Sequence, residues 1–253
     1  MNASPLISII MPVFNGAAHL PVSLASIRRQ NLVGSELIII DDGSTDDSAA
    51  VVRQLAPAAV YFHQKNAGCW AARNVGLARA QAPLVAFLDV DDEWPADALA
   101  ALRRALAGHS GALFALGRTR FVPIANEPVP APWVSPNLGA GLYRREVFTR
   151  SGNFDEGRRT AGDVEWFLRV REQGVPYVTI EEDTLLYRRR VGSLTAGKTW
   201  HDVGLQSAIR ASLARRRQAA GGQAKELALL SGSKDDPRAS QEVKHGSQER
   251  TTH

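Results

Sequence analysis

Short apolar runs alternate with helical patterns over the first part of the chain, and this alternation constrains the fold more than any other feature. Four runs have the length and composition of buried strands, at 6–11, 36–40, 60–63 and 83–88. The segments around them carry apolar residues at helical spacing, at 18–29, 44–55, 71–80 and 95–106. Strands joined by helices pair in parallel. The sequence therefore predicts an α/β fold with a mostly parallel, Rossmann-like sheet flanked by helices.

The second part of the chain is less regular. Residues 142–150 and 164–173 have helical spacing, and Gly174 would end the second helix. Residues 177–180 have the composition of a short strand, and the proline-rich stretch 123–136 is typical of a loop.

A single domain is expected to precede a charged tail. We place the domain at 5–215, with halves at 5–110 and 111–215, and expect the tail at 216–253 to be basic and disordered. The chain has 30 Lys and Arg against 26 Asp and Glu, and nine of the former and five of the latter lie from Arg210 onward. The net charge of +4 therefore comes from the C-terminal end, and no nucleic-acid partner is expected.

Cysteine usage and the apolar runs favour a cytoplasmic protein. Cys69 is the only cysteine, which excludes an intramolecular disulfide and a cysteine zinc cluster. The run at 6–11 is too short for a secretory signal, and no stretch approaches the ~20 apolar residues of a membrane helix. We expect a cytoplasmic location. Arginines 215–217 leave open a peripheral contact between the basic tail and the anionic inner membrane face.

Two acidic clusters follow buried strands, where ligands bind in open α/β sheets. Asp41 and Asp42 end the second run, and the sequence Asp-Val-Asp-Asp at 89–92 ends the fourth. Asp89 and Asp91 would share one face of an extended segment. Paired carboxylates suit Mg²⁺ or Mn²⁺, which commonly bridge to a substrate phosphate. Taken alone, each cluster is explained equally well as a solvated turn that caps the next helix.

Two further segments supply polar candidates. Gly68 follows the third strand, and a glycine there lets the backbone approach a ligand closely. Arg73 on the next helix could make a charge-assisted contact with a pyrophosphate or could pair with a surface carboxylate. Asp163 stands at the start of a helix, where it could cap the helix or act as a general base aimed into a cleft.

The order of these segments resembles the family-2 glycosyltransferases of the GT-A fold. The matching segments are Pro12-Val13-Phe14-Asn15, Asp41-Asp42-Gly43-Ser44, Asn66-Ala67-Gly68 with Arg73-Asn74, and Asp89-Val90-Asp91-Asp92. In that family the first strand ends in P-x-Y/F-N, the second in D-D-G-S and the fourth in D-x-D-D. The resemblance covers residues 6–193 and implies a GT-A sheet with an irregular, acceptor-binding second half.

The resemblance also implies a role for each matching residue. Nucleotide-sugar binding would fall to Pro12, Val13, Asn15, Asp41, Asp42, Asn66, Gly68, Arg73, Asp89, Val90 and Arg190. Asp91, together with Asp89, would bind the Mg²⁺ or Mn²⁺ ion that bridges the diphosphate of the donor. Asp163 would be the catalytic base.

The implied reaction is an inverting, metal-dependent transfer of a sugar from a nucleotide-diphosphate sugar, most often a UDP-sugar in the family. The acceptor would be a hydroxyl of a glycan, a lipid-linked molecule or a small molecule. Two residues depart from the family pattern: Gly162 replaces a common Glu before the base, and Arg190 stands where H-x-G-S has its His. The fixed charge of Arg190 could clamp a diphosphate. The alternatives are a catalytically degenerate protein that binds a nucleotide-sugar or glycan, or a nucleotidyltransferase.

Overall fold

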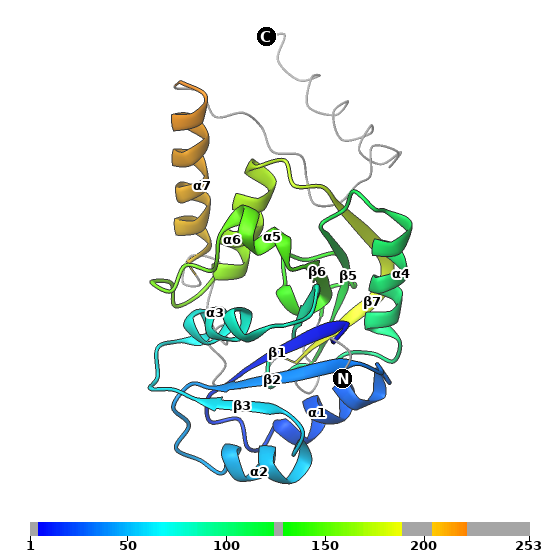
Figure 1. The fold of residues 1–253 in the computed structure, drawn as a ribbon. Helices are drawn as coiled ribbons and strands as arrows, with labels where there is room; N and C mark the ends of the chain where they lie inside the picture. Colours follow the sequence, from blue (N-terminus) through cyan, green and yellow to red (C-terminus); the bar gives the residue numbers. More distant parts are fainter. Residues whose placement is uncertain (1–4, 124–128, 189–203, 222–253) are drawn as a thin grey trace, which may run out of the picture.

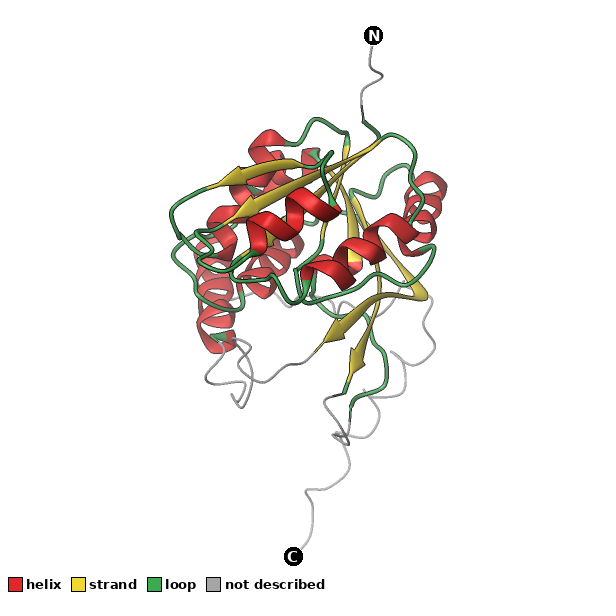
Figure 2. Ribbon diagram, turned by 90° about the horizontal axis from the view of Figure 1, so that it is seen from below, coloured by secondary structure: helices red, strands yellow, loops and turns green. Residues whose placement is uncertain are grey.

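The computed structural model describes residues 5–123, 129–188 and 204–221, and it contains one seven-stranded sheet with helices on both faces (Figures 1 and 2). The elements of the first half are β1 Ile7–Val13, α1 Leu20–Arg29, β2 Ser35–Asp41, α2 Ser48–Leu55, β3 Val60–His63, α3 Cys69–Arg79, β4 Leu84–Phe87 and α4 Ala98–Gly108. Those of the second half are β5 Phe114–Val122, a 3₁₀ turn Leu138–Ala140, β6 Gly141–Arg144, α5 Glu146–Ser151, α6 Gly162–Glu172, β7 Tyr177–Arg188 and α7 Leu205–Ala219.

The first half of the sheet is parallel, as the alternation of strands and helices predicts. The strand order is β3-β2-β1-β4-β6-β5-β7, and β1 pairs in parallel with β2 and β4, while β2 pairs in parallel with β3. Every residue of β1 is buried, because both faces of this central strand are covered. The carboxyl ends of β1, β2 and β4 therefore meet at one edge of the sheet.

Two hydrophobic clusters cover the two faces of the sheet. One cluster joins alternate residues of β1, such as Ile9, to α1, α2 and α4, and the other joins residues such as Ile10 to α3, α5 and α6. Gly76 allows α3 to approach β1 closely, since a Cβ at that position would lie 2.4 Å from Cγ2 of Ile10. This close contact fixes the helix that carries Arg73.

The second half departs from the sequence prediction at two strands. The helix predicted over 142–150 is wrong in its first part, because Gly141–Arg144 forms β6, antiparallel to β4 and β5, and only Glu146–Ser151 is helical. Leu142 and Tyr143 bury their side chains in the two different clusters, which is the alternation of a strand. Strand β5 was not predicted, and β7 is longer than the predicted strand at 177–180.

Aromatic packing fixes α6 against the sheet. Trp166 is fully buried, its ring centroid lies 5.1 Å from that of Phe148 in a stacked arrangement, and its Nε1 donates to the carbonyl oxygen of Gly152 at 3.1 Å. Phe114 of β5 stacks on Tyr177 of β7 with centroids 5.0 Å apart. Because these rings anchor α6, the position of Asp163 at its N-terminal end is determined by the core.

The C-terminal part of the described chain is helical beyond the predicted domain boundary. Helix α7 continues to Ala219, so the expectation of disorder from 216 onward is wrong for its first four residues. Residues 222–253 lie outside the described residues. Within the described ranges, none of the helices combines the length and the apolar character needed to cross a membrane.

Candidate functional site

Three loops meet at the carboxyl edge of the parallel strands. The backbone N–H of Asn15 donates to Oγ of Ser44 at 2.9 Å, and the side-chain Oδ1 of Asn15 accepts from the backbone N–H of Thr45 at 2.8 Å. The loop after β1 also touches the turn after β4, since a Cβ on Gly16 would lie 2.7 Å from Cγ2 of Val90. The sequence motifs that end β1, β2 and β4 are thus brought together in space.

The side chains of Pro12 and Val13 face inward. Both residues are buried within β1, and Val13 belongs to the hydrophobic cluster with α1, α2 and α4. The backbone carbonyl of Val13 accepts from the backbone N–H of Asp42 at 2.7 Å. In the structure these residues thus support the edge of the sheet. That they also line a nucleoside pocket stays a prediction.

Asp41 is a buried carboxylate held by neighbouring donors. Its Oδ1 accepts from the backbone N–H of Ser44 at 2.8 Å, its Oδ2 accepts from the hydroxyl of Tyr61, and Nδ1 of His63 lies 3.4 Å from Oδ2. Burial on its own would raise the pKa of Asp41, but the hydrogen bonds from Tyr61, Ser44 and His63 outweigh it and hold the pKa below its usual value. Asp41 is therefore ionised at neutral pH.

Asp42 holds the glycine loop after β3. Its Oδ1 accepts from Nε2 of Gln64 and from the backbone N–H of Ala67, and its Oδ2 accepts from the backbone N–H of Gly68, all at 2.8 Å. The side-chain amide of Asn66 donates to the backbone carbonyl of Asp42 at 2.9 Å. The carboxylate of Asp42 is thus used for positioning this loop.

If this loop binds the nucleotide, as the family resemblance implies, replacing Asp42 by alanine should weaken that binding. The change leaves two backbone N–H groups and one amide without their acceptor, and Gly68, with φ +94°, would lose the contact that fixes it. We expect a 10- to 100-fold rise in the Kd for a nucleotide diphosphate, roughly 1.4–2.8 kcal/mol, measured by calorimetry. The same affinity in Asp42→Ala and in the exposed control Asp47→Ala would contradict this role.

Arg73 is a buried cation at the centre of the site. It is 5% exposed, forms an ion pair with Asp89, and its guanidinium carbon lies 4.4 Å from the ring centroid of Trp70. Its Nε and Nη1 are buried and have no hydrogen-bond partner within the described part of the chain. Buried donors of this kind are costly unless a partner satisfies them, and a role for Arg73 in binding a diphosphate stays a prediction.

The acidic segment 89–92 is a turn, so the prediction of an extended segment is wrong. Strand β4 ends at Phe87, and the backbone N–H of Asp92 donates to the carbonyl of Asp89 at 3.1 Å. The side chain of Asp89 faces Arg73, whereas Asp91 and Asp92 line a pocket between α1 and the end of β7. The other lining residues of this pocket are His19, Val22, Ser23, Val90, Val122, Pro123 and Arg188.

Asp92 is a buried carboxyl that the motif analysis did not assign to the site. Its Oδ1 accepts from the backbone N–H of Arg188 at 3.0 Å, and burial, together with Asp89 and Asp91, raises its pKa well above the usual value. The sequence carries a signal for it only as the last Asp of the D-x-D-D motif. Asp92 ties the turn to β7.

Asp163 follows Gly162, which packs against the Trp70 indole that contacts Arg73, so residues from different parts of the chain meet here. Burial raises the pKa of Asp163 to about 6, the backbone hydrogen bond from Val164 and the charge of Arg73 lower it, and the charge of Asp89 raises it. A carboxylate with a pKa near 6 is a competent proton acceptor at neutral pH. The structure thus brings the candidate base to the acidic edge of the sheet.

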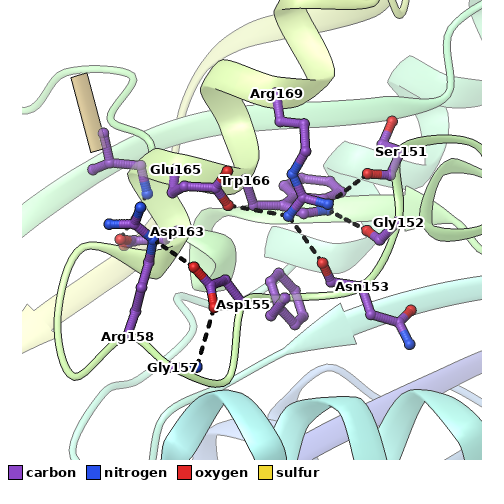
Figure 3. A network of polar contacts seen from close by, with 12 residues as sticks. Ser151, Gly152, Asn153, Asp155, Gly157, Arg158, Asp163, Glu165, Trp166 and Arg169 are labelled. Atoms are coloured by element: carbon purple, nitrogen blue, oxygen red, sulfur yellow. Dashed lines mark hydrogen bonds and ion pairs between the residues drawn. The ribbon is translucent and has the colours of Figure 1, made fainter. Parts of the chain in front are cut away.

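A polar network supports the segment that leads into Asp163 (Figure 3). Arg169 donates from Nη1 to the carbonyl of Ser151 at 2.6 Å, and from Nη2 to the carbonyl of Asn153 at 2.9 Å and to Oε2 of Glu165 at 3.1 Å. Ala161, with φ 53°, turns the chain into α6. Helix α6 thereby holds both ends of the 151–161 loop.

The carboxylates of this turn do not form a complete metal site by themselves. Within the described residues, no group of three or more His, Cys, Asp or Glu side chains could hold a metal ion by itself. Mg²⁺ and Mn²⁺ sites often use one or two carboxylates plus substrate phosphates. Because Asp89 faces Arg73 whereas Asp91 lines a pocket, a metal site that joins the two carboxylates stays a prediction. Arg190 lies outside the described residues.

Comparison with solved structures places the chain among GT-A folds. It has a TM-score of 0.69 and 19% identity to S. aureus TarS 1–349 in complex with UDP-GlcNAc, covering 84% of this chain and 66% of that one. The TM-score is 0.62 and the identity 20% for the mannosyltransferase PcManGT from Pyrobaculum calidifontis in complex with GDP-Man and Mn²⁺, covering 87% and 77%.

The family follows from the sequence comparison. The model described as "Glycosyl transferase family 2" matches residues 8–167, and the chain belongs to this family. A relative described as the uncharacterized glycosyltransferase EpsJ of Bacillus subtilis (strain 168) is 28% identical over 217 residues, 76% of this chain and 63% of that protein. The chain spans less than two thirds of the length of the first curated relatives that it matches.

Proposed function

We propose that this chain transfers a sugar from a nucleotide-diphosphate sugar to an acceptor hydroxyl, with Asp163 as the general base. The observation that carries the proposal is the packing of Gly162, the neighbour of Asp163, against the Trp70 indole that also contacts Arg73, the ion-pair partner of Asp89. The carboxylate of Asp163 accepts the proton of the acceptor hydroxyl. The oxygen then bonds to the anomeric carbon as the bond to the diphosphate breaks, which inverts that carbon.

The donor half of the site is assigned to the loops after β1 to β4. Asp41 and the 66–68 loop would contact the nucleoside, and the unpartnered N–H groups of Arg73 would contact the diphosphate. A Mg²⁺ or Mn²⁺ ion held by Asp91, with Asp89, would neutralise charge on the leaving diphosphate. The TarS complex contains UDP-GlcNAc and the PcManGT complex contains GDP-Man and Mn²⁺, and these support a nucleotide-sugar donor and a divalent metal. We favour a UDP-sugar, as the family resemblance implies.

A thermal-shift panel of UDP-, GDP-, dTDP- and CDP-sugars, each with and without Mn²⁺, tests this proposal. We expect one nucleotide class to raise the Tm by roughly 5–10 °C at 100 times its Kd, and only with Mn²⁺. Asp91→Asn should abolish the Mn²⁺-dependent part, whereas Asp97→Asn, an exposed aspartate a few residues later, should keep it. Equal shifts without metal would exclude the metal role, and no shift with any nucleotide would exclude the donor site.

A further inference from the structure

Gly162, the residue before the proposed base, has no room for a side chain. A Cβ at this position would lie 2.4 Å from Cε2, 2.7 Å from Cδ2 and 2.8 Å from Cζ2 of the Trp70 indole. Real Cβ atoms essentially never approach another heavy atom within 3.0 Å. The φ angle of Gly162 is not in the left-handed region, so the indole ring, rather than backbone strain, requires glycine here.

The same indole supports Arg73. Trp70 is 6% exposed, and the guanidinium carbon of Arg73 lies 4.4 Å from its ring centroid. Phe154, in the loop that leads to α6, packs against the indole with ring centroids 5.7 Å apart. One rigid ring thus touches the binding cation on its own helix and the residue next to Asp163 on another.

We propose that Trp70 and Gly162 form one positioning unit, in which the indole occupies the space of a side chain at 162 and sets the placement of Arg73 relative to Asp163. The inference rests on the proposed function, which assigns binding to Arg73 and proton transfer to Asp163. It also explains a departure from the family pattern: the common Glu before the base is absent because Trp70 fills its place. Gly162 and Trp70 together then take the place of that Glu, and the glycine does not indicate a loss of catalysis.

A double-mutant cycle tests the pairing. Gly162→Ala should push the indole away, lower the Tm, weaken nucleotide-diphosphate binding and reduce kcat on the order of 10- to 100-fold, because small displacements of catalytic groups are costly. In a Trp70→Ala background the ring that meets the new Cβ is absent, so Gly162→Ala should change each quantity less than about threefold relative to Trp70→Ala alone. Gly108→Ala is the matched control, since a Cβ there meets nothing within 4 Å.

Three readouts separate the possible outcomes. All assays are run well below the lowest Tm, so that every variant is folded. A purely structural contact would then lower the Tm of Gly162→Ala and leave kcat and nucleotide affinity unchanged. That result would overturn the positioning role. Equal effects of Gly162→Ala in the unsubstituted protein and in the Trp70→Ala background would overturn the pairing. If the unsubstituted protein shows no transfer, the proposed function fails, and the cycle in Tm and nucleotide affinity still decides whether Trp70 and Gly162 act together.

Discussion

Replacing Asp163 by asparagine should abolish sugar transfer and leave nucleotide-sugar binding intact. Asparagine has nearly the same shape as aspartate but cannot accept the proton of the acceptor hydroxyl. A positioned general base contributes ~10²–10⁴-fold to the rate, so we expect kcat to fall by that factor. The Kd for the donor should change little, because the loops proposed to bind the donor follow β1 to β4. Rates are measured with saturating donor, and donor affinity is measured by calorimetry on the same preparation.

The pH profile gives the same assignment an independent check. Since burial raises the pKa of Asp163 to about 6, its basic form is lost as the pH falls through that value. We expect kcat/KM, which reports the free enzyme, to be level above about pH 7 and to fall tenfold per unit well below pH 6. Asp47→Asn removes one exposed negative charge and should keep this profile. A variant Asp163→Asn with near-normal turnover, or a flat profile between about pH 5 and 8, would rule out the base.

The parallel half of the fold could be predicted because each element carries its own local signal. Runs such as 36–40 are apolar throughout most of their length, since a central strand is buried on both faces, and they end abruptly at acidic residues. The helices between them have apolar residues at helical spacing. The edge of the sheet, and with it the meeting of the Asp41 and Asp89 loops, then follows from the direction of parallel strands.

The mixed half could not be predicted in the same way. Strand β6 has only four residues, too few to distinguish a period of two from one of 3.6, and the residues that follow soon become helical. Strand β5 alternates Arg118 and Arg120 with other residues, and its two arginines both donate to Asp183 of β7. The pairing partner that stabilises this strand lies roughly 60 residues further along the chain, outside any local pattern.

The candidate site, too, could be predicted from the sequence only in part. The motifs located Asp41, Asp91 and Asp163 as candidates, but the contacts that give other residues their roles join distant elements. Nothing local in the sequence indicates that Tyr61 donates to Asp41 or that Trp70 fills the space beside Gly162. Such contacts depend on the relative placement of whole elements, which packing determines.

Replacing Arg215 should have a large effect on stability and turnover, because this residue ties α7 to α6, the helix that carries Asp163. Its Nε and Nη2 donate to Glu172 at 2.6 and 3.1 Å, and its Nη1 donates to Oε1 of Glu165 at 3.0 Å. The Glu165 and Glu172 side chains are 5% and 10% exposed, and Glu165 also accepts from Arg169. Arg215 thus completes the network that holds the loop before Asp163.

Arg215→Ala should therefore lower both stability and turnover. Glu172 would lose the donors of Arg215, and Glu165 would keep only Arg169. Breaking a fully buried pair costs several kcal/mol; because Arg215 is 35% exposed, we expect about 1–3 kcal/mol. That corresponds to a Tm lower by roughly 2–12 °C. Loosening of α6 should also reduce kcat by about tenfold, with little change in donor affinity, as measured well below the Tm.

Arg217→Ala is the matched control, because Arg217 belongs to the same arginine run but its side chain is exposed. We expect it to keep the Tm within a degree or two and to keep kcat. If the run instead serves an anionic membrane surface, Arg217→Ala should weaken binding to phosphatidylserine vesicles at least as much as Arg215→Ala does, since an exposed arginine is the one available to a surface. Equal Tm values for the two variants would show that α7 does not hold the helix of the base through Arg215.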